Sequence, residues 1–112
     1  DMHLSDLSKA VTLKHLCGPE ADAFEGVYVG DLLSRAMSRV QADNLWITIM
    51  NNINVVAVAS LTEAAAVILA ENVALTQEVY EAANTKGISI YSAKESVYDL
   101  CAIISRCTDQ NQ

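Results

Sequence analysis

The stretch LWITIMNNINVVAVASLTEAAAVILA, residues 45–70, decides the fold of this chain. Its first part, 45–50, predicts a strand, because apolar side chains alternate between its two faces. Its last part, 67–70, is a compact apolar strand. The valines of 54–66 favour a strand as well, but a helix capped by Asn54 would collect one apolar face from Val55, Val58, Ala59 and Thr62. We prefer the helix, because two parallel strands need a crossover connection between them.

The chain before this stretch supplies two further strands and two helices. A short helix opens at 4–7 with Ser5 as its cap, and strands are expected at 13–17 and 27–30. Asp31 stands where the N-cap of the next helix belongs. The apolar residues of that helix recur at helical spacing, at Leu33, Ala36, Met37 and Val40.

The chain after this stretch continues the alternation of helices and strands. Thr76 caps a helix that closes at Gly87, and 88–91 is the last strand. Ser92 and Glu95 have the spacing of a capping box, which opens the final helix. The order predicts a layered α/β domain with a mostly parallel sheet of about five strands flanked by helices. We expect one domain over residues 1–112, with an ordered core at about 4–106.

The charge of the chain argues against nucleic acid as a partner. The formal net charge is −7, and no lysine or arginine occurs in 40–85. Binding to phosphates needs cations, and the sequence has no basic stripe. No apolar run approaches the roughly 20 residues of a membrane span, and we find no signal peptide. We therefore expect a cytoplasmic protein that binds neither nucleic acid nor membrane.

The sequence offers little for catalysis or for a bound metal. The three cysteines, Cys17, Cys101 and Cys107, include no CxxC pair, which favours reduced thiols without a metal. His15 and Cys17 would share one face of the strand 13–17, but no third group is placed to orient the imidazole. Neither a GxGxxG nor a GxxxxGK[ST] motif is present. We expect no catalytic residue, no metal site and no cofactor.

A ligand site is expected at one edge of the predicted sheet. Open α/β sheets bind ligands beyond the carboxyl ends of their strands, beside the first turns of the helices. The candidate ligand-binding residues at this edge are Gly30, Asp31, Met50, Asn51, Asn52, Glu71, Asn72 and Ser92. The alternative is that Asp31 and Ser92 only cap helices, since every helix start needs such residues.

Three segments together resemble the DRTGG-domain family. They are GVYVGDLLS at 26–34, NLWITI at 44–49 and NVVAVASL at 54–61, and GISI at 87–90 before a Ser-led helix completes the match. The resemblance covers 4–106 and is closest to the stand-alone members encoded beside iron-only hydrogenase genes. The eponymous motif is changed: its Asp-Arg pair would fall near Asn52-Ile53, and its Thr-Gly-Gly near 70–72.

The resemblance implies a regulatory α/β domain of the kind also found in phosphotransacetylases and, fused with CBS domains, in certain pyrophosphatases. It implies dimerisation and the sensing of a small ligand. Apolar groups beyond the needs of one small core, at Tyr28, Met37, Trp46 and Met50, also favour a homodimer.

Three hypotheses for the function remain. Our preferred hypothesis is a non-catalytic homodimeric module that senses a ligand such as a nucleotide for a redox or energy-metabolism enzyme. A small enzyme acting on a phosphorylated or nucleotide substrate is the second hypothesis, but it would need a general base paired with a cation near the strand ends. A purely structural dimerisation domain is the third.

Overall fold

The computed structural model describes residues 2–110. Along the chain its elements are β1 (Met2–His3), α1 (Leu4–Leu7), β2 (Lys14–Cys17), β3 (Ala23–Phe24), β4 (Val27–Val29), α2 (Leu33–Arg39), β5 (Leu45–Thr48), α3 (Ile53–Thr62), β6 (Ala66–Leu69), α4 (Gln77–Lys86), β7 (Ile90–Ser92) and α5 (Val97–Gln110). None of the helices within this range is long and apolar enough to cross a membrane.

The main sheet has five strands in the order β2-β7-β6-β5-β4. Strands β4 to β7 are mutually parallel, whereas β2 runs antiparallel to β7 at one edge. Strands β1 and β3 form a separate small antiparallel pair. The predicted α/β class with a mostly parallel sheet of five strands is confirmed.

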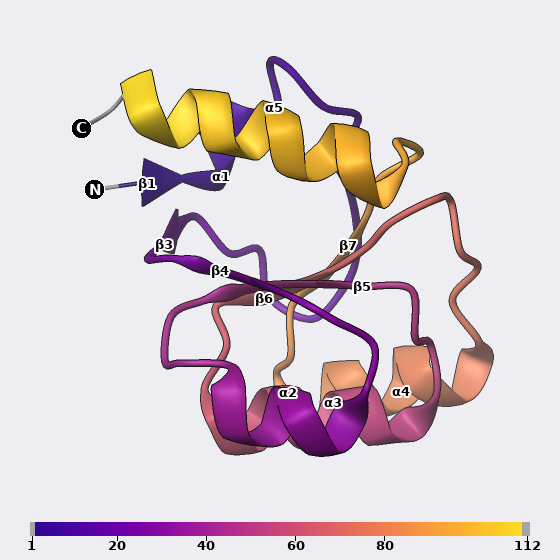
Figure 1. Ribbon diagram of the computed structural model, residues 1–112. Coiled ribbons are helices and arrows are strands. Elements are labelled where there is room, and N and C mark those ends of the chain that lie inside the picture. The colour runs from indigo at the N-terminus through magenta and orange to yellow at the C-terminus, as the bar shows by residue number, and fades with distance from the viewer. Residues whose placement is uncertain (1, 111–112) are drawn as a thin grey trace.

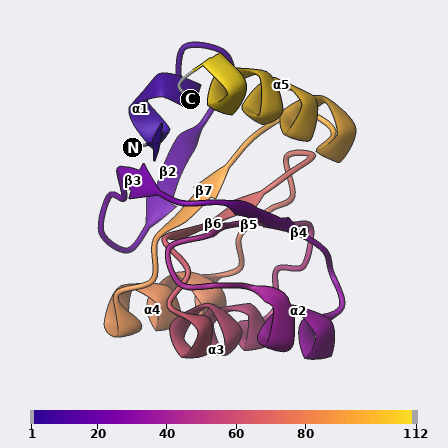
Figure 2. The same cartoon turned by 60° about the vertical axis from the view of Figure 1, so that its left-hand side comes forward.

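Helices cover both faces of this sheet (Figures 1 and 2). Helices α2, α3 and α4 form one layer below it, and α1 and α5 lie above it. The alternation predicted for β5 is present, because Leu45 and Ile47 are buried on the α5 side and Trp46 is buried on the α3 side. Trp46 is therefore a core residue and is not one of the extra apolar residues that could cover a dimer interface.

The connection between β5 and β6 is the preferred helix, α3. Its cap differs from the prediction, because the side chain of Asn52, not that of Asn54, accepts a hydrogen bond at the helix start. Asp31 does not cap α2 either. The helix begins after Leu32, which makes no side-chain capping bond, and Asp31 bonds to the neighbouring strand instead.

The predicted capping box before the last helix is wrong. Ser92 belongs to β7, and α5 begins at Val97. The hydroxyl of Ser96 accepts from the backbone amide of Asp99 at 3.0 Å and caps this helix. Ser5 likewise lies inside α1, whose N-cap position is His3.

Strand β2 contains a bulge that the sequence did not reveal. His15 pairs with Tyr91 and Cys17 with Ile90, so that the register shifts between them. The rings of His15 and Tyr91 pack edge to face, with their centroids 5.2 Å apart. Cys17 is buried in the hydrophobic cluster on the opposite side of the sheet. The bulge places the two side chains on different faces, and the predicted pairing of His15 with Cys17 is therefore wrong.

Candidate functional site: the carboxyl edge of the sheet

The eight predicted site residues gather along one edge of the sheet. The loops that follow β4, β5 and β6 and the end of β7 lie on the right-hand side of Figure 1. They meet there because the strands are parallel and neighbouring, so their carboxyl ends share an edge. The prediction that these residues bind a ligand requires a separate test, since each also takes part in the local structure.

Asp31 joins the ends of β4 and β5. Its carboxylate oxygen Oδ1 accepts from the hydroxyl of Thr48 at 2.7 Å and from the backbone amide of Ile49 at 2.9 Å. Thr48 is only 1% exposed, so its hydroxyl depends on this partner. The preceding residue, Gly30, accepts the indole N–H of Trp46 on its carbonyl at 3.0 Å. The bonds of both residues hold the end of the edge strand β4 against β5.

Glu71 and Asn72 join the end of β6 to the start of α5. Both have left-handed backbones, with φ of 59° and 56°. Their amides donate to the carbonyls of Glu95 and Ala93 at 2.9 Å each. The Glu71 carboxylate also accepts from the amide of Val97, at 3.3 Å, in the first turn of α5. This carboxylate thus occupies a position at a helix N-terminus that an anionic ligand would need.

Glu95 extends the same connection to the segment before β2. Its two carboxylate oxygens accept from the hydroxyl and the amide of Thr12, at 2.9 and 3.3 Å. Burial by itself would raise the pKa of Glu95, but hydrogen bonds from its own backbone and from Thr12, with the charge of Lys94, outweigh it and lower that pKa below its usual range. The side chain is therefore a structural anion.

The remaining edge residues present amides and a thioether. Asn51 donates from its side chain to the carbonyl of Ala74 at 2.7 Å, and Asn52 caps α3. Met50 is half-buried against the cluster around Trp46. Such groups can hydrogen-bond the edge of a base or a ribose hydroxyl, but they supply no cation for a phosphate. The neighbouring carboxylates make this edge acidic.

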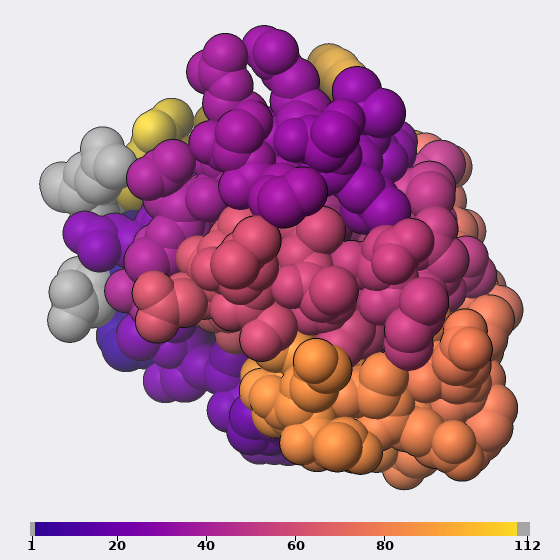
Figure 3. Space-filling model, turned by 90° about the horizontal axis from the view of Figure 1, so that it is seen from below, coloured from indigo at the N-terminus to yellow at the C-terminus, as the bar shows by residue number. Residues whose placement is uncertain are grey.

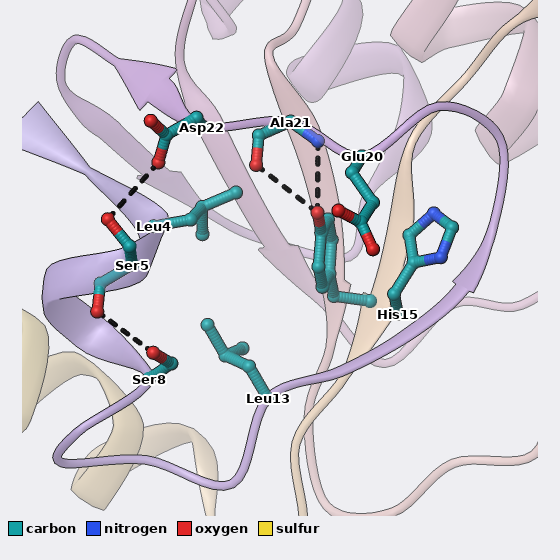
Figure 4. Close-up of a pocket in the computed structure, with 9 residues that line it drawn as sticks. Leu4, Ser5, Ser8, Leu13, His15, Glu20, Ala21 and Asp22 are labelled. Carbon is teal, nitrogen blue, oxygen red and sulfur yellow. Dashed lines mark hydrogen bonds between the residues drawn. The ribbon is translucent and has the colours of Figure 1, made fainter.

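A hollow of about 590 Å³ lies elsewhere, beside β2, and the sequence gave no signal of it. Figure 4 shows Ser5 and Ser8 at one end and Glu20 and His15 at the other. Leu4, Leu13 and Tyr91 supply apolar surface between them. The hollow depends on contacts between residues distant in the sequence, because the Tyr91 hydroxyl accepts from the amide of Ala21 at 2.9 Å and donates to its carbonyl at 3.2 Å.

The polar groups of this hollow are already bonded or acidic. His15 donates from Nε2 to the carbonyl of Gly18 at 2.8 Å, and Ser5 donates to the Asp22 carboxylate at 3.3 Å. Glu20 and Asp22 line it, and its described lining includes no lysine or arginine. A phosphate-bearing ligand would be repelled there. None of the four hollows described for the chain is lined by any of the eight predicted edge residues.

The described residues also show no arrangement for a metal. Within 2–110 no group of three or more histidine, cysteine, aspartate or glutamate side chains is placed to hold an ion. Cys17 is buried and Cys101 half-buried, and burial raises the pKa of both thiols. Both thiols therefore stay protonated at neutral pH, and a thiol in that state is a poor ligand and a poor nucleophile.

The chain was compared with family models and with solved structures, and both comparisons found a match. The family model described as the DRTGG domain matches residues 6–107. The chain belongs to the DRTGG domain family. In fold it is similar to a crystal structure of the CBS and DRTGG domains of the regulatory region of Clostridium perfringens pyrophosphatase, complexed with the activator diadenosine tetraphosphate. The TM-score is 0.75 at 11% identity, over 95% of this chain and 47% of that one.

The chain therefore spans about half the length of that regulatory region. No protein of curated function has a significantly similar sequence. Glu71 and Asn72, near which the resemblance to the family places the two glycines of the DRTGG motif, have left-handed backbones of the kind that glycine accepts most easily.

Proposed function

We propose that this DRTGG domain is a non-catalytic, homodimeric regulatory module that senses a small ligand such as a nucleotide. The observation that carries the proposal is the correspondence of nearly the whole chain, 95% of it, to part of a regulatory region that was crystallised with a nucleotide activator. The resemblance to stand-alone members encoded beside iron-only hydrogenase genes favours a redox or energy-metabolism enzyme as the regulated partner. We also propose a cytoplasmic location, because the three cysteines include no CxxC pair and are typical of reduced thiols.

We place the ligand at the carboxyl edge. Asn51, Asn52, Asn72 and Ser92 offer uncharged hydrogen-bonding groups there, which suit a nucleoside. The exposed Lys94, in the loop that follows β7, is a cation near the same edge. The carboxylates of Asp31 and Glu71 are held by Thr48 and Val97, so they shape the edge and do not act as bases. A general base paired with a cation, which the enzyme hypothesis needs, is not among these contacts.

Thermal unfolding tests the ligand. The purified protein is heated with AMP, ADP, ATP and diadenosine tetraphosphate in turn, and a ligand that prefers the folded state raises the Tm. We expect at least one nucleotide to raise it. A Tm that none of them changes would contradict nucleotide sensing, and release of phosphate or of a cleaved nucleotide during the incubation would contradict a non-catalytic role.

A pair of matched variants tests whether the ligand binds at the carboxyl edge. Ser92→Asp adds a negative charge at the carboxyl edge, and Ser105→Asp adds the same charge on the exposed surface of α5. Both should stay folded by circular dichroism. We expect Ser92→Asp to lose the nucleotide-induced rise in Tm through like-charge repulsion, and Ser105→Asp to keep it. Equal rises in both variants would put the ligand away from this edge.

A further inference from the structure

Helix α3 has no charged residue, although one side of it faces solvent. Its sequence is INVVAVASLT, from Ile53 to Thr62. Val55, Val56, Val58 and Ala59 are buried against the sheet and the neighbouring helices, while Asn54, Ala57, Ser60 and Leu61 are exposed. A surface helix normally places charged residues on its outer side, whereas the outer side of α3 carries only uncharged ones. The outer side of α3 is therefore suited to a protein contact.

The surface around α3 is apolar and hollowed. A hollow of about 300 Å³ between α2 and α3 is lined by Leu33, Met37, Asn54, Ala57, Val58 and Leu61. Leu61 is 67% exposed and Met37 48% exposed. Figure 3 shows this face of the molecule, where α2, α3 and α4 lie next to one another with α3 in the middle. Side chains from a partner could enter the hollow and cover these residues.

The two flanking helices carry opposite charges. Helix α2 has the exposed Arg35 and Arg39 and no acidic residue. Helix α4 has the exposed Glu78 and Glu81, with Lys86 only at its end. A cationic strip, an uncharged strip and a mainly anionic strip thus follow each other across one face. Such a face is complementary to itself when it is turned about an axis along the middle strip.

We propose that this face, defined by α2, α3 and α4, binds a second copy of the chain about a two-fold axis parallel to α3. The two α3 helices pack against each other, and α2 of each copy lies over α4 of the other. The arginines of one copy then meet the glutamates of the other, whereas turning the copy end over end would place like charges together. The inference rests on the homodimer of the proposed function and identifies its interface.

Light scattering after gel filtration tests the interface. The wild type should have twice the 12.1 kDa mass of one chain. Leu61→Lys places a charge on an exposed position of α3, so it should leave the fold intact and raise the dimer Kd by about 100-fold, as loss of a central contact does. Tyr98→Lys is the matched control, because Tyr98 is 80% exposed on α5, on the other side of the sheet. It should stay dimeric.

Charge reversal tests the orientation. Arg35→Glu and Glu81→Arg should each weaken the dimer by about fivefold, the scale of an exposed ion pair, and the double variant should regain most of the loss. A double variant that binds no more tightly than the single variants would overturn the arrangement in which α2 of each copy lies over α4 of the other. A wild type that stays monomeric in concentrated solution would overturn the homodimer itself. A dimer that survives Leu61→Lys, or that is lost in Tyr98→Lys, would overturn this face and leave the homodimer standing.

Discussion

Ser96 and Ser92 are both near the start of α5, yet only Ser96 accepts a hydrogen bond from it. We expect Ser96→Ala to lower the free energy of unfolding by about 1 kcal/mol, because the amide of Asp99 loses its partner. Ser92→Ala, at the end of β7, should cost clearly less. Urea unfolding of the two variants checks the comparison. A larger loss in Ser92→Ala would contradict the assignment of the stabilising cap to Ser96.

Asp31 is a single exposed residue that satisfies a buried one. We expect Asp31→Ala to lower the free energy of unfolding by about 1–3 kcal/mol, because it leaves the Thr48 hydroxyl without its acceptor in a buried place. Asp31→Asn keeps an oxygen at Oδ1 and should lose less. Urea unfolding measures both. Equal losses in the two variants would mean that the charge of Asp31, and not its hydrogen bond to Thr48, stabilises the edge.

At the scale of the elements, the order of helices and strands could be predicted because each follows from a local pattern. The alternation of 45–50 and the helical spacing in 33–40 involve only near neighbours, and both produced the element expected. The helix α3 followed from a requirement of the whole sheet, since its valines alone were ambiguous. Parallel strand ends then brought the eight site residues to one edge without further information.

Caps and loop contacts could not be predicted in this way. A cap depends on which side-chain oxygen reaches an amide, and a shift of a few residues moves that role from Asn54 to Asn52 and from Ser92 to Ser96. The bonds that Val97 donates to Glu71 and that Thr12 donates to Glu95 join segments that are distant in the sequence. The bulge in β2 and the hollow beside it depend on packing against β7, which no local pattern records.

The connection between the β7–α5 loop and the segment before β2 should depend on pH. The pKa of Glu95 is lowered in the folded state, so its stabilisation is present above the pKa of an unfolded glutamate and is lost as the pH falls through the folded-state pKa. We expect the wild type to exceed Glu95→Gln in free energy of unfolding at about pH 7, by a small amount because the group is near solvent, and the gap to close on acidification. Urea unfolding across this range measures the gap. A gap that stays constant would contradict the role of the carboxylate.

At the scale of the whole molecule, two hydrophobic clusters lie on opposite sides of one sheet. The cluster under α5 contains Ile47 and Ile68, and the cluster over α3 contains Trp46 and Val67. These residues alternate along β5 and β6, so each central strand is part of both clusters. Neither helical layer can separate from the sheet without exposing the strands on which the other layer packs.

We therefore expect one cooperative unfolding transition. Trp46 is the single tryptophan of the chain and is fully buried on the α3 side, so its fluorescence reports on that cluster. Far-ultraviolet circular dichroism reports on all the helices, with α5 as the longest. In urea the two signals should change together, with a common midpoint and an m value of about 1–3 kcal/mol/M. Separate midpoints would show that α1 and α5 fold independently of the α2–α4 layer, and the prediction of one domain would then be wrong.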